Sequence, residues 1–255
     1  MNIARARNLT QVFSFILSNL GFDIAFKTGI PCPFFYCYGC PYATFACPIG
    51  TLQHFVIFPA FPLYLLGAIG MLGVAFGRFF CGWACPFGAL HDLLAYINKA
   101  RNRKLRSFTY SKFLMLFIVL LAAWFTVDTF FCKFCPSGSL WAALPSAVVY
   151  PQLNFGLFFY VHIVTLVVTV CLGLMIARFW CRYLCPFAPI GIFNRISLAT
   201  VSLDHDQCSE CNKCLESCPM SIQKVEEVGR SSDCIGCGRC VEVCQTKALK
   251  IGIRR

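Results

Sequence analysis

The sequence predicts an all-α membrane domain of four transmembrane helices in two pseudo-symmetric hairpins, followed by a small α+β domain. The 255-residue chain is 58% hydrophobic and only 13% charged, about half the charged share of a soluble domain. Four apolar segments approach the length of a membrane crossing. From about Val201 the composition becomes polar. We therefore expect a membrane domain over residues 1–198 and a second domain over residues 199–255.

The four apolar segments run from about Leu9 to Phe26, from Phe55 to Phe76, from Phe113 to about Val127, and from Phe155 to Ile176. A helix needs roughly 20 residues to cross the hydrocarbon core of a bilayer. The first segment is the weakest because it carries Gln11, Asn19 and Asp23. Pro59 and Pro62 are expected in the first turns of the second helix, where proline is tolerated.

Basic residues gather at alternate ends of these segments. One side carries Arg5, Arg7, Lys99, Arg101, Arg103, Lys104, Arg106, Lys112, Arg178, Arg182 and Arg195, whereas the opposite loops carry Lys27 and Lys133. Cytoplasmic loops of membrane proteins hold an excess of Lys and Arg. The sequence thus predicts a multi-pass protein of the cytoplasmic (inner) membrane, with both termini and the second domain in the cytoplasm. The net charge of +11 then reflects topology and membrane lipid, and we expect no nucleic-acid partner.

The chain repeats itself at an offset of 100 residues. Arg78-Phe79-Phe80-Cys81 with Cys85-Pro86-Phe87 matches Arg178-Phe179-Trp180-Cys181 with Cys185-Pro186-Phe187. On the other side, Cys37-x2-Cys40-Pro41 resembles Cys132-x2-Cys135-Pro136, and a competing alignment pairs Cys47-Pro48-Ile49-Gly50 with Cys135-Pro136-Ser137-Gly138. Each half is then a helical hairpin with cysteines at both membrane faces. A parallel repeat brings matching pairs together near its axis.

Eight of the nineteen cysteines form a duplicated motif near the C-terminus. The two runs are Cys208-x2-Cys211-x2-Cys214-x3-Cys218-Pro219 and Cys234-x2-Cys237-x2-Cys240-x3-Cys244. This is the spacing of bacterial ferredoxins with two [4Fe–4S] clusters, in which each fourth cysteine ligates the other cluster. One cluster is expected on Cys208, Cys211, Cys214 and Cys244, and the other on Cys234, Cys237, Cys240 and Cys218. Zinc is disfavoured because eight cysteines with no histidine in this duplicated spacing fit iron–sulfur clusters far better.

Four more cysteines mark the cytoplasmic ends of the two hairpins. In Cys81-x3-Cys85 and Cys181-x3-Cys185 the spacing of four places both sulfurs of a pair on one helical face. Together the two pairs could hold one further iron–sulfur cluster. The alternative is packing, or redox-active thiols without metal.

The outer face carries a second candidate quartet, Cys37, Cys40, Cys132 and Cys135, with Cys47 as a substitute. Electrons do not tunnel efficiently across a hydrocarbon core of roughly 30 Å in one step, so a redox centre in the outer half would shorten the gap. The alternative is disulfide bonding, which is common outside the cytoplasm.

The run from Arg78 to Gly88, the second Cys-x3-Cys-Pro copy and the double ferredoxin motif resemble the NapH/NosR-type membrane ferredoxins, over residues from about Phe55 to the C-terminus. The resemblance implies four spans, oxidation of menaquinol or ubiquinol, and electron delivery toward extracytoplasmic reductases. Its implied partners are other redox subunits, either ferredoxin-like proteins or an extracytoplasmic reductase or cytochrome. The outer cysteines are not required by that pattern, and they suggest that electrons leave through a protein-bound centre.

The sequence therefore predicts a membrane-bound electron-transfer subunit of an oxidoreductase complex. Its electrons would pass between the cytoplasmic ferredoxin domain and either quinol or an outer-face acceptor. Two alternatives stay open: export of reductant by thiol–disulfide exchange through the outer cysteines, and a redox assembly or sensor protein. Donor, acceptor and direction of flow are not specified by the sequence.

Overall fold

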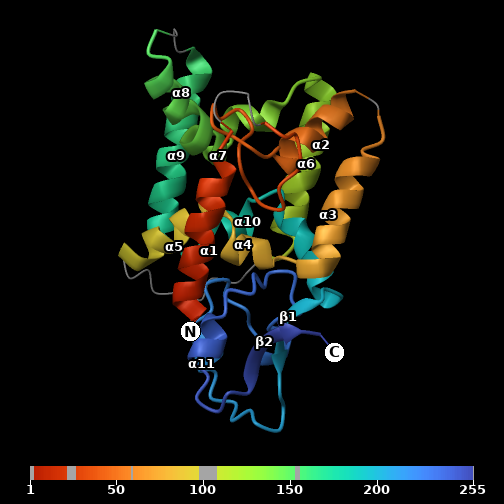
Figure 1. Ribbon diagram of the computed structural model, residues 1–255, viewed down its shortest axis with the longest axis vertical. Helices are drawn as coiled ribbons and strands as arrows, with labels where there is room; N and C mark the ends of the chain where they lie inside the picture. Colours follow the sequence, from red (N-terminus) through yellow and green to blue (C-terminus); the bar gives the residue numbers. More distant parts are fainter. Residues whose placement is uncertain (1–2, 22–26, 59, 98–107, 153–155, 255) are drawn as a thin grey trace.

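Four helices run along the long axis of the molecule. They are α1 (Ile3–Ser18), α3 (Leu63–Phe76), α6 (Ser111–Thr126) and α9 (Leu157–Met175) (Figure 1). The structure is a computed structural model that describes residues 3–21, 27–58, 60–97, 108–152 and 156–254. The cysteine-rich C-terminal part lies against one end of the four helices, and the N-terminus lies at that same end.

Short elements cover both ends of the helical part. Beside the C-terminal part lie α4 (Phe79–Trp83), α5 (Pro86–Ile97), α10 (Phe179–Tyr183) and η3 (Ala188–Arg195). Toward the far end lie α2 (Pro48–Ile57), η1 (Phe130–Phe134), α7 (Pro136–Gly138), η2 (Ser139–Ala143) and α8 (Leu144–Val149). Proline is the first residue of α2, α5 and α7, a position where its missing N–H costs nothing. These three Cys-Pro sequences therefore serve as helix starts.

In the described part of the chain, α9 is the one helix long and apolar enough to cross a membrane by itself, whereas α3 and α6 are shorter apolar helices. The segment predicted as one span from Phe55 to Phe76 is two helices. α2 ends at Ile57 and α3 begins at Leu63. Pro62 precedes α3, and proline lacks the N–H that a continuous helix would need there. Pro59 and residues 22–26 of the first predicted span lie outside the described residues.

All four long-axis helices expose large apolar side chains. Phe13 of α1 is 67% exposed, Met71 of α3 71%, Phe125 of α6 78% and Leu157 of α9 75%. Soluble monomers rarely expose contiguous apolar patches larger than a few hundred Å². The sides of the helical part are therefore suited to an apolar environment such as lipid.

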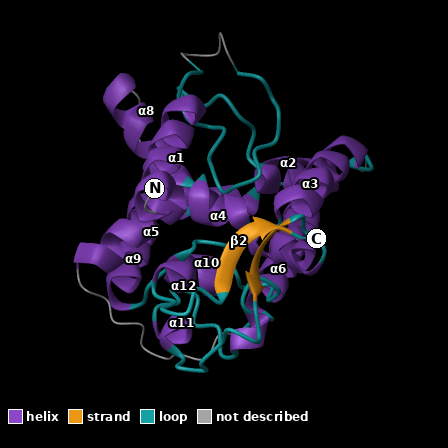
Figure 2. Ribbon diagram, turned by 60° about the horizontal axis from the view of Figure 1, so that its bottom comes forward, coloured by secondary structure: helices purple, strands orange, loops and turns teal. Residues whose placement is uncertain are grey.

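The C-terminal part is α+β, as predicted. Its strands β1 (Ala199–Leu203) and β2 (Leu249–Ile253) pair antiparallel, with Val201 opposite Ile251 (Figure 2). Short helical turns α11 (Lys213–Glu216), η4 (Val225–Glu227) and α12 (Arg239–Glu242) connect the cysteine runs. Val201, Ile222, Val228, Cys234 and Leu249 form its buried core.

The helical part and the C-terminal part meet through backbone contacts that only glycine permits. A Cβ atom on Gly82 of α4 would lie 2.4 Å from the carbonyl oxygen of Ile235, and one on Gly191 would lie 2.0 Å from that of Ser232. Trp83 Nε1 also donates a hydrogen bond to the carbonyl of Gly236 at 2.9 Å. The cysteine loop at 234–237 is thereby held directly against α4.

We predict that Gly82→Ala weakens this junction. The added methyl group must displace the Ile235 carbonyl, and overpacking of this kind costs typically about 1–3 kcal/mol. The measurement is the unfolding temperature of the protein in detergent, followed anaerobically, and we expect a decrease of several degrees. Gly67→Ala is the matched control, because nothing lies within 4 Å of a Cβ at that position. Equal unfolding temperatures for the two variants would contradict the prediction.

Candidate functional site

The two cysteine runs of the C-terminal part line two cavities. Cys208, Cys211, Cys214 and Cys244 line the first. Cys218, Cys234, Cys237 and Cys240 line the second, and Cys214 reaches that cavity as well. Each cavity therefore combines three cysteines of one run with the last cysteine of the other. Because Cys214 lines both, the two cavities adjoin.

The backbone of the two runs repeats residue for residue. Positive φ angles occur two and four residues after the first cysteine of each run, and three residues after the last, at Glu210, Asn212 and Ser221 in one run and at Gly236, Gly238 and Lys247 in the other. Left-handed backbone is uncommon outside glycine, so its recurrence at matching positions shows that both copies of the motif fold alike. These turns direct each set of cysteines toward its cavity.

The four inner cysteines come together from both halves of the repeat. Cys81 is 9% exposed, Cys85 4%, Cys181 7% and Cys185 6%. Their thiols are close enough to interact electrostatically, Cys85 with Cys81 and Cys181, and Cys185 with Cys181 and Cys81. Burial raises the pKa of the Cys181 thiol, and the nearby Arg178 and Arg78 oppose that rise. The quartet predicted from the repeat is thus assembled at one place.

Two arginines connect the halves reciprocally. Arg78 Nη2 donates to the carbonyl of Cys181 at 2.6 Å, and Arg178 Nη1 donates to the carbonyl of Cys81 at 2.9 Å. Each arginine stands three residues before the cysteine of its own half and binds the cysteine of the other half. The pseudo-symmetry predicted from the 100-residue offset is therefore expressed in paired contacts around the inner cysteines.

One carboxylate stands behind Arg178. Asp92 of α5 accepts from Arg178 Nε at 3.0 Å and from Nη2 at 2.6 Å. Arg7 of α1 and Arg239 of α12 approach the same carboxylate at 3.6 Å and 3.5 Å. Burial alone would raise the pKa of Asp92, but the adjoining Arg178 lowers that pKa to about 2. Asp92 therefore stays ionised and connects α1, α5, α12 and the second half of the repeat.

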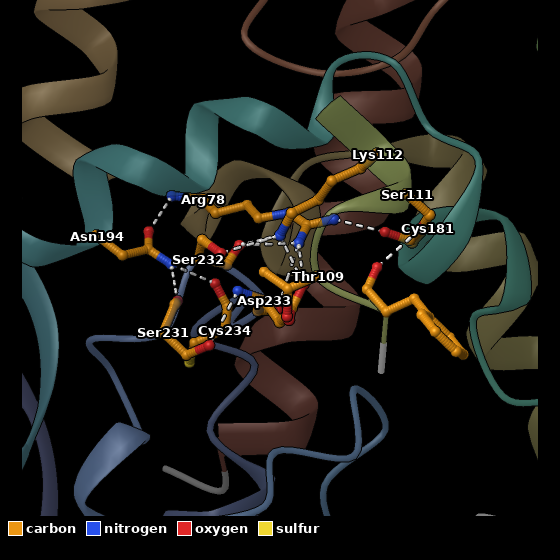
Figure 3. A network of polar contacts seen from close by, with 11 residues as sticks. Arg78, Thr109, Ser111, Lys112, Cys181, Asn194, Ser231, Ser232, Asp233 and Cys234 are labelled. Atoms are coloured by element: carbon orange, nitrogen blue, oxygen red, sulfur yellow. Dashed lines mark hydrogen bonds and ion pairs between the residues drawn. The ribbon is translucent and has the colours of Figure 1, made fainter. Parts of the chain in front are cut away.

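A second carboxylate stands behind Arg78 (Figure 3). Asp233 accepts from Lys112 Nζ at 2.6 Å and from Thr109 Oγ1 at 2.7 Å, and Arg78 Nη1 lies 3.8 Å from it. Asn194 Nδ2 donates to the carbonyl of Cys234 at 2.7 Å. Because Asp233 precedes Cys234, this network joins the inner quartet to the second cysteine run.

By sequence alone, Lys112, Arg178 and Arg182 are loop charges that indicate topology. In the structure these side chains are buried, with 0%, 0% and 2% of their surfaces exposed. Lys112 and Arg178 are tolerated there because each forms an ion pair with a carboxylate and donates to a backbone carbonyl. The positive charge of the sequence is therefore in part a property of this buried site.

The outer cysteines that converge differ from the predicted quartet. Cys37 and Cys135 both interact electrostatically with Cys47 and Cys132. A Cβ on Gly50 would lie 3.9 Å from Cys132 Sγ and 4.0 Å from Cys47 Sγ, so these two sulfurs flank one glycine. Cys40 interacts with the phenol of Tyr36 as well as with Cys37. Cys47, predicted as the substitute, thus joins this group of outer cysteines. The competing repeat alignment through Cys47-Pro48 describes the group better.

Cys-Pro turns recur at both cysteine groups. The backbone N–H of Gly88 donates to Cys85 Sγ at 3.4 Å, and that of Gly138 donates to Cys135 Sγ at 3.4 Å. Amide hydrogen bonds to sulfur stabilise thiolates and tune the potentials of iron–sulfur clusters. The same local geometry therefore directs a backbone amide at one inner and one outer sulfur.

Comparison with known families decides the class of protein. Residues 40–61, 57–106, 110–144 and 158–193 match the family described as 4Fe-4S binding domain, and these residues make up more than half of the chain. The chain belongs to the 4Fe-4S binding domain family. Residues 200–245 match a 4Fe-4S dicluster domain in addition. The iron–sulfur character predicted from the cysteine spacing is confirmed.

Relatives within reach of sequence comparison include ferredoxin-type proteins. The chain is 29% identical to "Uncharacterized protein MJ0749" of Methanocaldococcus jannaschii over 79% of this chain and 76% of that protein. It is 30% identical to "Putative electron transport protein YccM" of Escherichia coli over 71% of this chain and 53% of that protein. It is 29% identical to "Ferredoxin-type protein NapH" of Haemophilus influenzae over 75% of this chain and 69% of that protein. The resemblance to NapH-type proteins is thereby confirmed. No solved structure matches the chain.

The cysteine sets of this 4Fe-4S binding domain protein suit iron–sulfur clusters. The second C-terminal cavity is walled mainly by thiols and apolar side chains, among them Met220 and Ile222, whereas Glu210, Asn212 and Lys213 also line the first. Within the described residues, no three His, Cys, Asp or Glu side chains converge on the position of a single metal ion. When bound by such thiolates, an iron–sulfur cluster takes up and releases single electrons.

The sequence alone does not indicate that several residues belong to this site. Asp92 and Asp233 are isolated acidic residues in the sequence, and nothing in their spacing indicates a partner. Arg78 and Arg178 carried a signal, because an arginine recurs three residues before the first cysteine in both copies. That signal identified a repeat and not the reciprocal contacts, which depend on how the halves pack.

We predict that Cys244→Ser removes the cluster of the first cavity alone. About four irons per chain should be lost, because three thiols of the other run stay in place without their fourth ligand. Iron and acid-labile sulfide analysis after anaerobic purification measures the loss. Cys171→Ser is the control, because Cys171 is exposed on α9 and belongs to none of the cysteine groups. An unchanged iron content in Cys244→Ser would rule out this ligand.

Proposed function

We propose that the protein carries single electrons between its dicluster part and either quinol or an acceptor at the outer face, as the electron-transfer subunit of an oxidoreductase complex. One observation carries the proposal. Cys81, Met220 and Ile235 form a buried group, and Cys218 and Cys237 pack against it. A cysteine of the inner quartet thus adjoins two cysteines of the second C-terminal cavity.

The first step joins the dicluster part to the inner quartet. The glycine contact at Gly82 and the hydrogen bond from Trp83 hold the Ile235–Gly236 backbone against α4. No layer of solvent or lipid has to be crossed there. Tunnelling between centres on the two sides of this junction is therefore short.

The second step crosses from the inner to the outer cysteines. The buried core of the helical part contains Cys85 and Cys185 together with Cys32, Cys40 and Cys135. Cys85 Sγ lies 3.8 Å from the carbonyl of Phe35, whose ring stacks on Trp180 at 6.2 Å between centroids. The chain between residues 27 and 47 therefore descends between the helices toward α4 (Figure 1). This descent supports a gap much shorter than the roughly 30 Å core.

The proposed ligands follow the four cysteine groups. They are Cys208, Cys211, Cys214 and Cys244; Cys234, Cys237, Cys240 and Cys218; Cys81, Cys85, Cys181 and Cys185; and Cys37, Cys47, Cys132 and Cys135. The first two groups would hold [4Fe–4S] clusters, and the last two would hold further iron–sulfur centres. The potentials of donor and acceptor decide the direction of flow.

The proposed setting is a cytoplasmic membrane crossed by the four long-axis helices. Exposed apolar side chains on α1, α3, α6 and α9 support it. The start of α1, the end of α3, the start of α6 and the end of α9 all lie toward the C-terminal part. Exposed basic residues of the described chain near those ends, such as Arg5 and Arg195, favour the cytoplasm for that side. Its partners would then be lipid and other redox subunits.

Quinol exchange is favoured by a cleft between α1 and α5. The cleft measures about 710 Å³, and its lining includes Phe15, Leu93 and Trp141 with Arg7 and Asp92 at its polar end. Pro86, next to Cys85, also lines it, and Gln11 Nε2 donates to the carbonyl of Gly82 at 3.0 Å. An apolar cleft with polar groups at one end suits an amphipathic ring compound beside the inner cysteines.

We predict that the wild-type protein binds more than about eight irons per chain. Combined Cys81→Ser and Cys181→Ser substitutions should remove about four of them while the dicluster signals in the EPR spectrum persist. Electron transfer from the reduced dicluster part to quinone or an outer acceptor should then stop. About eight irons in both proteins would overturn the intramembrane relay. Outer thiols that become alkylated only after reduction would favour thiol–disulfide export.

We predict that Ala89→Trp, which fills the cleft, abolishes quinol oxidation and leaves the iron content unchanged. Ala89 is among the residues that line the cleft. The measurement is reduction of the clusters by quinol in proteoliposomes, with chemical reduction as the control for intact clusters. Undiminished reduction by quinol in this variant would rule out this cleft as the quinol site.

A further inference from the structure

The inner quartet is surrounded by buried positive charge. Arg78 is 1% exposed, and Lys112 and Arg178 are 0% exposed. Among the described residues, five buried side chains are cationic (Arg7, Arg78, Lys112, Arg178 and Arg182), but two buried side chains are anionic (Asp92 and Asp233). The interior at this level therefore holds more cations than carboxylates.

Excess positive charge away from water is strongly destabilising unless an anion lies near it. Arg178 pairs with Asp92 of α5, and Arg78 lies 3.8 Å from Asp233 of the C-terminal part. The same guanidinium groups also donate to the carbonyls of Cys181 and Cys81. Four thiolate ligands give an iron–sulfur cluster a net negative charge, which matches the missing anion.

The backbone of Arg178 is held in an unfavourable conformation. Its φ of 52° and ψ of 37° lie in the left-handed region, which non-glycine residues rarely occupy. In the other half the left-handed φ falls one residue earlier, on Gly77 with φ of 55°. Such strain persists where the surroundings over-determine it and is frequent at functional sites. Here it accompanies the contacts of Arg178 with Asp92 and Cys81.

We propose that Arg78 and Arg178, with Lys112, are the counter-charges of the inner centre, and that they set its reduction potential while aligning the two halves that ligate it. This inference rests on the proposed function, because it requires a centre on the inner quartet. Reduction adds one electron to that centre, breaks no bond and moves no proton. Nearby cations stabilise the more negative state, so they raise the potential, and Asp92 and Asp233 moderate that effect.

The test measures the midpoint potential of the inner centre by EPR-monitored redox titration of the full chain, with the signal assigned by its loss in Cys81→Ser. Arg78→Met and Arg178→Met should each lower the potential by about 59 mV or more, an about tenfold change in the one-electron equilibrium constant. Asp92→Asn and Asp233→Asn should raise it. Arg195→Met removes the same charge from an exposed side chain and should leave the potential unchanged.

An electrostatic role requires that the Arg→Met and Asp→Asn variants shift the potential in opposite directions, whereas a structural role does not. Shifts in one direction for all four variants, or unchanged potentials with an intact signal, would overturn the inference and leave the proposed function standing. Absence of an inner signal in the wild type would instead overturn the proposed function. If an Arg→Met variant loses the centre, the direction of the potential shift in the two Asp→Asn variants still tests the inference. Arg78→Lys keeps the charge, so the potential should stay the same. The same variant should speed alkylation of Cys181 in the metal-free protein, and this alkylation rate reports on alignment alone.

Discussion

Reciprocal hydrogen bonds from Arg78 and Arg178 to the carbonyls of Cys181 and Cys81 hold the centre of this molecule together. Each bond runs from one half of the repeat to the other, so neither half can bring its cysteine pair into position alone. The carboxylates behind the arginines extend the same constraint outward. Asp92 reaches α1 through Arg7, and Asp233 ties Lys112 of α6 to the C-terminal part. Charge pairing thus organises a region in which most other contacts are apolar.

The descent of residues 27–47 between the helices gives the helical part its second organising feature. Phe35 lies among Phe87, Phe131 and Trp180, with ring centroids 5.9–6.3 Å apart. These rings are buried in the core that also contains Cys85, Cys185, Cys40 and Cys135. Irregular backbone is tolerated in such a core where the surrounding protein supplies its hydrogen-bond partners. The cysteines predicted at the outer face are therefore drawn toward the middle of the fold.

The duplicated cysteine spacing predicted the C-terminal part well, because eight ligand positions in a fixed pattern leave few ways to fold. The 100-residue offset likewise predicted that Cys81, Cys85, Cys181 and Cys185 meet. Helix bounds were harder: hydropathy merges α2 with α3, since Pro62 interrupts the helix without changing the apolar composition. The choice between Cys40 and Cys47 depended on the path of an irregular loop, which no periodicity describes. The roles of Asp92 and Asp233 could not be predicted, because their cationic partners are distant in sequence.

Burial at the junction of the two parts restricts the order in which the protein can be assembled. Cys81 is 9% exposed and Cys234 is 8% exposed once the Gly82 and Ile235 backbones are in contact. Scaffold proteins that deliver metal and sulfide need access to open thiols, and the closed junction denies it. Any cluster on these thiols would therefore have to be inserted before the C-terminal part closes onto the helical part. Biogenesis of this chain is in that sense a sequential process, with docking as its final step.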